Sequence, residues 1–167
     1  INPDGRGAAE RFFTYLKDSP AKVEVVLGDA RLSLEQEAPR GFDLLVADAF
    51  SGDAIPVHLV TKEAWELYLS HLKADGVIAF HISNTYLDLR PVILRIAKEL
   101  GLKATIIKSE GQEEPDTQRA EWILAAKSGE VLNDDIIKRA AAKEEVRFND
   151  GHLWTDNFSN LLKIVRW

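Results

Sequence analysis

Two aspartates follow an apolar run in a pattern that suits proton transfer or cation binding. The run from Phe42 to Ala47 is almost entirely apolar, Asp48 follows it, and Asp53 comes later in a turn that Pro56 closes. Such a run is typical of a buried strand, and open α/β folds bind ligands outside the carboxyl ends of their strands. A carboxylate there can act as a general base. The alternative stays open that Asp48 accepts turn N–H groups and that Asp53 is an ordinary turn residue.

A third carboxylate, Asp29, ends another predicted strand. A β-branched run over 22–29 closes with Gly28-Asp29, and a short helix is predicted over 30–36. Asp29 can accept hydrogen bonds from the amino groups of a ligand, or it can cap the helix that begins at Ala30. The sequence favours neither alternative.

A polar cluster of His81, Ser83 and Asn84 ends the apolar run over 77–83. Parallel strands joined by crossovers end at the same edge of a sheet, so we expect this cluster to converge with Asp29 and Asp48. A lone histidine is more often structural than catalytic. The four histidines of the chain do not have the spacing of metal ligands, so we expect no metal.

The elements that must position these residues alternate along the chain. Helices are predicted over 8–17, over 30–36, from an N-cap at Thr61 to residue 72, over 89–100, and after an N-cap at Asn133. Strands are predicted over 22–29, 42–48, 77–83, 103–108 and 121–127. This alternation is typical of a mostly parallel sheet with helices on both faces. The last two strands have a short polar connection without a helix, which predicts an antiparallel pair at one edge. We expect one α/β domain over 1–167.

Composition narrows the class of protein. The chain has 167 residues, 46% of them hydrophobic and 29% charged, which is ordinary for a globular protein. A net charge of −6 argues against nucleic-acid binding. The absence of cysteine excludes disulfides and thiolate catalysis. The chain opens at Ile1 and holds no methionine, which we interpret as a piece of a longer or processed protein.

Several segments form an ordered pattern along the chain: Gly28 to Arg31, Phe42 to Phe50, and His58 to Thr61 followed by a helix and Leu72 to Val77. In this order they resemble the spermidine synthase-like branch of the polyamine aminopropyltransferases, which share the fold of S-adenosylmethionine-dependent methyltransferases. The tail from Trp154 to Leu161 resembles the ending of members that are fused to transporter-like membrane domains. The resemblance implies a Rossmann-like methyltransferase-type sheet, mostly parallel, with an antiparallel edge hairpin.

The resemblance also implies roles for individual residues. Asp48 would deprotonate the attacking amine and contact the co-substrate. The adenine end of the nucleoside would meet Asp29 and Ala30. The amine substrate would be bound by Asp53, His81 and Asp156.

The implied reaction transfers an aminopropyl group from decarboxylated S-adenosylmethionine to a diamine such as putrescine. The alternatives are a methyltransferase that uses S-adenosylmethionine on an unknown acceptor, and a non-catalytic domain of the same fold. The resemblance implies that the protein binds a polyamine and does not bind nucleic acid. A homodimer is one oligomeric state that it allows. The implied location is the cytoplasm, or the cytoplasmic face of a membrane if a transporter-like domain is fused to the chain.

Two departures from the family pattern bear on these expectations. Asp48 and Asp53 are farther apart than the paired acids of typical synthases, and Pro56 comes later, which affects diamine specificity. The glycine-rich first strand and the acid that holds the ribose hydroxyls are absent from the chain. We therefore expect a sheet without that strand, and weak or no nucleoside binding by this chain alone.

Overall fold

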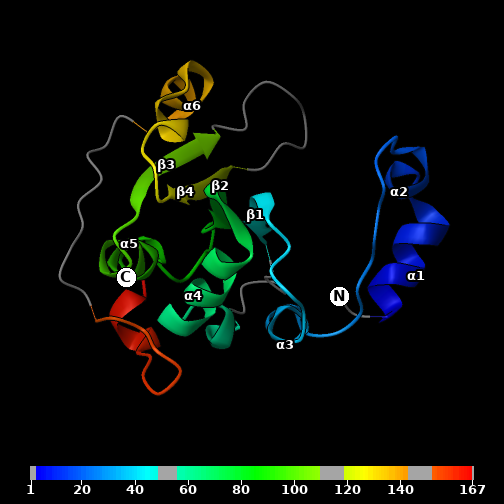
Figure 1. The fold of residues 1–167 in the computed structure, drawn as a ribbon. Helices are drawn as coiled ribbons and strands as arrows, with labels where there is room; N and C mark the ends of the chain where they lie inside the picture. The colour runs from blue at the N-terminus through cyan, green and yellow to red at the C-terminus, as the bar shows by residue number, and fades with distance from the viewer. Residues whose placement is uncertain (1–2, 49–55, 110–118, 143–151, 167) are drawn as a thin grey trace. The chain divides into compact units, whose positions relative to one another are not determined.

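The computed structural model describes residues 3–48, 56–109, 119–142 and 152–166 (Figure 1). The chain divides into two units, Ile1–Ala38 and Pro39–Trp167. Asp53 lies outside the described residues. The single domain expected over 1–167 stays a prediction.

The first unit holds three helices, α1 (Pro3–Phe12), α2 (Tyr15–Asp18) and α3 (Ala30–Glu35). The helix predicted over 8–17 is therefore two helices, and the first begins earlier than expected. The strand predicted over 22–29 is wrong, because these residues have no regular secondary structure. A β-branched run forms a strand only where a neighbouring strand accepts its pairing, so its propensity alone was not sufficient.

The second unit is built on a mixed sheet of four strands in the order β1-β2-β4-β3. These are β1 (Phe42–Ala47), β2 (Leu72–His81), β3 (Lys103–Ser109) and β4 (Ala120–Ala126). β1 and β2 are parallel, while β4 is antiparallel to both β2 and β3. The α/β class and the antiparallel pairing of the last two strands are confirmed. The antiparallel region is wider than expected because β4 lies between β2 and β3.

Helices α4 (Lys62–Ser70), α5 (Arg90–Glu99) and α6 (Asp135–Ala140) belong to the same unit, with three short 3₁₀ helices: η1 (Val57–Leu59), η2 (Val131–Asn133) and η3 (Leu161–Ile164). α4 begins as predicted, since the Thr61 side chain caps it by accepting from Ala64 N. α5 ends as predicted before Gly101, whose φ of 68° suits glycine. The cap of α6 is Asp134, one residue later than expected, because Asn133 is the last residue of η2.

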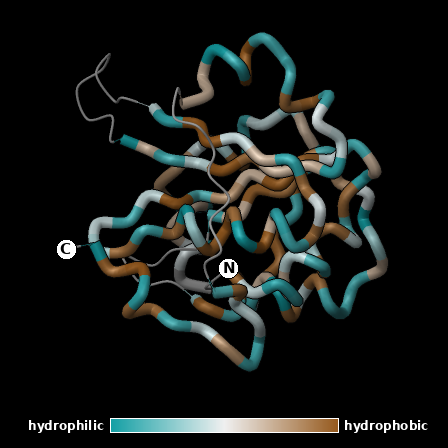
Figure 2. The backbone as a smooth tube through the Cα atoms, turned by 90° about the vertical axis from the view of Figure 1, so that its left-hand side faces the viewer, coloured by the Kyte–Doolittle hydropathy of each residue, from teal (hydrophilic) through white to brown (hydrophobic). Residues whose placement is uncertain are grey.

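The core lies on the central strand β2. Residues 77–80 of this strand are buried, and Phe80 stacks on Trp65 of α4 with ring centroids 5.7 Å apart. Figure 2 shows hydrophobic and hydrophilic stretches alternating along the backbone. Within the described residues β1 pairs with β2 on one side only, and its Leu44 and Val46 are 54% and 53% exposed.

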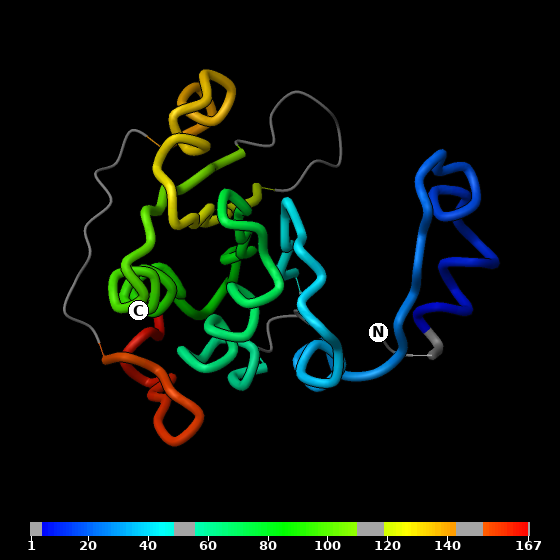
Figure 3. Tube along the Cα trace, viewed as in Figure 1, coloured from blue at the N-terminus to red at the C-terminus, as the bar shows by residue number. Residues whose placement is uncertain are grey.

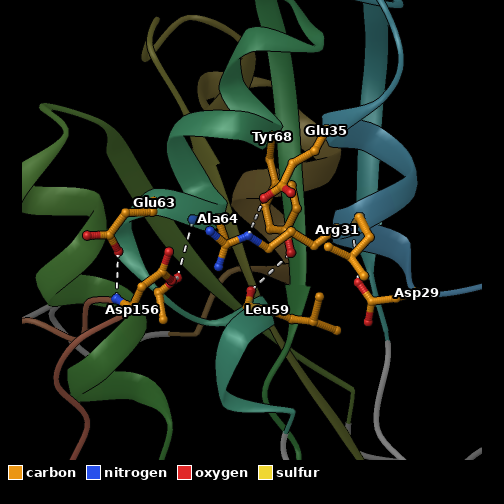
Figure 4. A network of polar contacts seen from close by, with 10 residues as sticks. Asp29, Arg31, Glu35, Leu59, Glu63, Ala64, Tyr68 and Asp156 are labelled. Atoms are coloured by element: carbon orange, nitrogen blue, oxygen red, sulfur yellow. Dashed lines mark hydrogen bonds and ion pairs between the residues drawn. The ribbon is translucent and has the colours of Figure 1, made fainter.

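Residues 152–166, the C-terminal segment, pack against the start of α4. Figure 3 shows the trace of this segment beside the helix. Trp154 is 1% exposed, and its carbonyl accepts a hydrogen bond from Lys62 N at 2.9 Å. Thr61 Oγ1 donates to Asp156 Oδ1 at 2.7 Å, and Asp156 N donates to Glu63 Oε2 at 2.9 Å (Figure 4). The segment therefore completes the capping of α4.

A carboxylate at the start of α5 gives the fold a pH dependence. Asp88 accepts hydrogen bonds from Arg90 N at 3.1 Å and from Arg90 Nε at 2.8 Å. Burial alone would raise the pKa of Asp88, but the hydrogen bonds and charge of Arg90, with a contribution from Arg166, hold this pKa below its usual value of 3.8. A lowered folded-state pKa stabilises the protein above the unfolded value, and this stability is lost as the pH falls through the folded value.

We expect Asp88→Asn to lower the free energy of unfolding by about 0.5–1 kcal/mol at pH 7, because asparagine keeps the contact to Arg90 N but loses the charge. This cost should shrink as the pH falls below 3.8, the usual value for the group. Urea unfolding across this pH range measures it. Glu99→Gln, which removes the exposed pair with Arg95, is the matched control. A cost for Asp88→Asn that stays constant with pH would contradict the prediction.

Candidate active site

The register of the two parallel strands brings Asp48 beside His81. Ala47 of β1 is paired with Phe80 of β2, so the next residue of each strand lies at the same carboxyl end. His81 Nδ1 is 2.8 Å from Asp48 Oδ1. This is the edge at which open α/β sheets place their ligand-binding residues.

The His81 ring is fixed on its remaining sides by β4 and by the residues after β2. His81 Nε2 is 2.8 Å from Ser83 Oγ, and Glu121 N donates to the same oxygen at 2.7 Å. The ring also stacks on Trp122, its cross-strand partner, with centroids 4.6 Å apart. The imidazole is therefore positioned before any ligand binds.

These contacts allow one continuous alignment of hydrogen bonds. Ser83 Oγ accepts from Glu121 N and has a hydroxyl proton to donate. When that proton is donated to His81 Nε2, the neutral ring carries its own proton on Nδ1 and donates it to the Asp48 carboxylate. This alignment connects β4 through His81 to Asp48, whose side chain is 53% exposed. Asp48 thus keeps a carboxylate oxygen for a ligand.

A pocket of about 540 Å³ lies next to this chain. Its lining comes from the end of β2, from the start of β4 and from the C-terminal segment: His81, Ser83, Asn84, Thr85, Arg119, Ala120, Glu121 and Arg166. Glu121 Oε1 is 3.6 Å from Lys108 Nζ, while Glu121 Oε2 is buried and accepts no hydrogen bond within the described part of the chain. The charged residues in the lining of the pocket are therefore two arginines and one glutamate.

Asp29 and Ala30 belong to the first unit, so the expected convergence of Asp29 with Asp48 stays a prediction. Asp29 caps α3, with its Oδ1 accepting from Leu32 N at 3.0 Å, and Ala30 is the first residue of that helix. Figure 4 shows Asp29 at α3 and Asp156 near Glu63. The roles predicted for Asp29, Ala30 and Asp156 in ligand binding stay predictions, as does that of Asp53.

Sequence reasoning missed the charged lining residues of the pocket, Arg119, Glu121 and Arg166. No motif surrounds them, and Arg166 is far along the chain from His81. The position of Arg119 and Glu121 follows from strand pairing, because β4 begins beside the end of β2, where His81 pairs with Trp122. Arg166 follows the bridge between Leu87 and Val165. The signal for Arg119 and Glu121 was their position at the start of a strand that was predicted to be antiparallel.

Within the described residues no group of three or more histidine, cysteine, aspartate or glutamate side chains is arranged to hold a metal ion. In the same part of the chain, no helix has the length and hydrophobicity needed to cross a membrane.

No family model matches the chain. It is 32% identical over 88 residues, or 52% of its length, to the polyamine aminopropyltransferase of Vibrio vulnificus, of which this match covers 28%. The spermidine synthase structure from Thermotoga maritima aligns with 94% of the chain at a TM-score of 0.59 and 17% identity. The chain has a spermidine synthase-like fold. It spans 52% of that structure's chain.

A second solved structure agrees on this fold. A probable spermidine synthase from Corynebacterium glutamicum aligns with 73% of the chain at a TM-score of 0.52 and 22% identity, and the chain spans 43% of it. The predicted resemblance to the spermidine synthase-like aminopropyltransferases is confirmed in sequence over these 88 residues and in fold over most of the chain.

Proposed function

We propose that the protein is an aminopropyltransferase that moves an aminopropyl group from decarboxylated S-adenosylmethionine to an amine. The hydrogen bond of 2.8 Å between His81 and Asp48, at the carboxyl ends of two parallel strands, carries the proposal. The similarity to a polyamine aminopropyltransferase over 88 residues and the spermidine synthase-like fold support it.

Asp48 acts as the general base in this proposal. The amine nitrogen attacks the carbon next to the sulfonium, so a C–N bond forms, the C–S bond breaks and methylthioadenosine leaves. The proton that the nitrogen loses passes to the Asp48 carboxylate. His81 is engaged at both ring nitrogens, so it is better suited to hold Asp48 in place than to take the proton itself. Catalysis then consists of positioning and proton removal.

The remaining residue roles belong to the same proposal. Asp29 and Ala30 contact the nucleoside of the co-substrate, and Asp53, His81 and Asp156 contact the acceptor. A diamine as acceptor, of which putrescine is one example, a homodimer, and a location in the cytoplasm or at the cytoplasmic face of a membrane are proposed on the same ground.

A product assay of the full-length protein tests the proposal. Decarboxylated and ordinary S-adenosylmethionine are each supplied with a panel of amines, and products are identified by mass spectrometry. We expect methylthioadenosine and an aminopropylated amine, with decarboxylated S-adenosylmethionine only. Formation of S-adenosylhomocysteine and a methylated product would instead show a methyltransferase. Absence of any product would contradict both activities and favour a non-catalytic domain.

A further inference from the structure

We propose that Arg119 and Arg166 form a subsite for a carboxylate, so that the acceptor is an amine that also carries a carboxylate group. The inference rests on the proposed aminopropyl transfer and names the class of acceptor for it. It starts from the charge of the pocket beside His81, which a simple aliphatic diamine does not match.

Both arginines line this pocket, and each lies on an anchored segment. Arg119 directly precedes β4, whose first residue, Ala120, donates its N–H to Ser109 Oγ at 3.1 Å. Arg166 N donates to Tyr86 O at 2.8 Å, next to the bridge between Leu87 and Val165. Within the described residues neither guanidinium forms a close ion pair, although the charge of Arg166 contributes to the lowered pKa of Asp88. Two arginines without a close carboxylate partner can bind a carboxylate through charge-assisted hydrogen bonds.

The neighbouring polar residue does not add an acceptor to the pocket. Asn84 Oδ1 already accepts hydrogen bonds from Tyr86 N at 3.0 Å and from Leu87 N at 2.8 Å. The two arginines therefore give this part of the pocket a positive charge, and positive charge repels a purely cationic diamine.

The carboxylate of Glu121 also belongs to the pocket lining, and its Oε1 is 3.6 Å from Lys108 Nζ. The pocket reaches His81, which holds the base Asp48. A diamine with a carboxylate thus places its anionic group at the arginines and its reacting amine near Asp48.

Ornithine and putrescine test this subsite in the full-length protein, because ornithine is the same 1,4-diamine with one added carboxylate. We expect kcat/KM to be higher for ornithine, by roughly tenfold or more, since a charged hydrogen-bonded pair is worth at least that much. Arg119→Gln and Arg166→Gln should lower the ratio of the two kcat/KM values, mainly by raising KM for ornithine. Arg139→Gln on α6, outside the pocket, is the matched control and should leave the ratio unchanged. If a glutamine variant does not fold, the lysine variant at that position replaces it.

The outcomes separate the subsite from the proposed function. Transfer to putrescine with no preference for ornithine, or a preference that both arginine variants keep, overturns the subsite and leaves the function standing. If neither amine reacts, the function fails, and calorimetry of ornithine and putrescine binding to the wild type and the variants decides the subsite by itself. Arginine variants that weaken binding of ordinary S-adenosylmethionine, and not of ornithine, would assign the carboxylate to the donor and overturn the inference.

Discussion

Asp48→Asn in the full-length protein is expected to lower kcat for aminopropyl transfer by about 10²- to 10⁴-fold, the usual contribution of a general base. Asparagine is nearly the same size, and its Oδ1 can still accept the hydrogen bond from His81 Nδ1, so the geometry of the site should persist. What is lost is the carboxylate that takes the proton from the amine. Steady-state assays with decarboxylated S-adenosylmethionine and a reactive amine measure the effect.

The matched control is Asp43→Asn at the other end of the same strand. The Asp43 side chain is 82% exposed and pairs with Lys73 on the surface. This variant removes the same charge from β1, and we expect wild-type kcat. Far-UV circular dichroism and thermal unfolding should be close to wild type for both variants. Unchanged turnover in Asp48→Asn would remove Asp48 from the role of base.

Trp154→Ala is expected to lower the free energy of unfolding by about 3–5 kcal/mol, the usual cost of deleting a fully buried aromatic side chain. Trp154 is 1% exposed and lies in the segment that completes the cap of α4. The loss would be a large part of the stability of an ordinary domain. Urea unfolding followed by circular dichroism measures it.

Two variants of the same segment serve as controls. Trp154→Phe keeps most of the buried ring and should cost clearly less than Trp154→Ala. Leu162→Ala removes a side chain that is 80% exposed, and surface changes of this kind usually stay within about 0.5 kcal/mol. A cost for Trp154→Ala similar to that of Leu162→Ala would show that the segment does not contribute to the stability of the core.

The elements that could be predicted are those whose signals are local. α4 has a capping threonine at Thr61 and α5 has helical periodicity closed by Gly101, and both begin or end where the sequence indicates. The meeting of Asp48 with His81 could also be predicted, because parallel strands end at one edge of a sheet whatever their exact register.

The elements that could not be predicted depend on pairing between distant segments. The run over 22–29 has the composition of a strand, yet a strand needs a neighbour, and no local pattern says which runs have one. The position of β4 between β2 and β3 also depends on pairing between distant segments. This strand order brings Glu121 and Arg119 to His81, so the sequence alone could not predict the pocket or its charged residues.

The exposed edge of β1 has a consequence for handling the protein in solution. In the part of the chain that the structure describes, β1 has no strand on its outer side, and its Leu44 and Val46 are exposed. Such an edge is a template on which another strand can add. Asp43 supplies a charge at one end of this edge, next to the Lys73 ammonium. Self-association of the isolated chain is therefore expected to begin at β1, and light scattering at rising concentration would detect it before enzymatic assays are attempted.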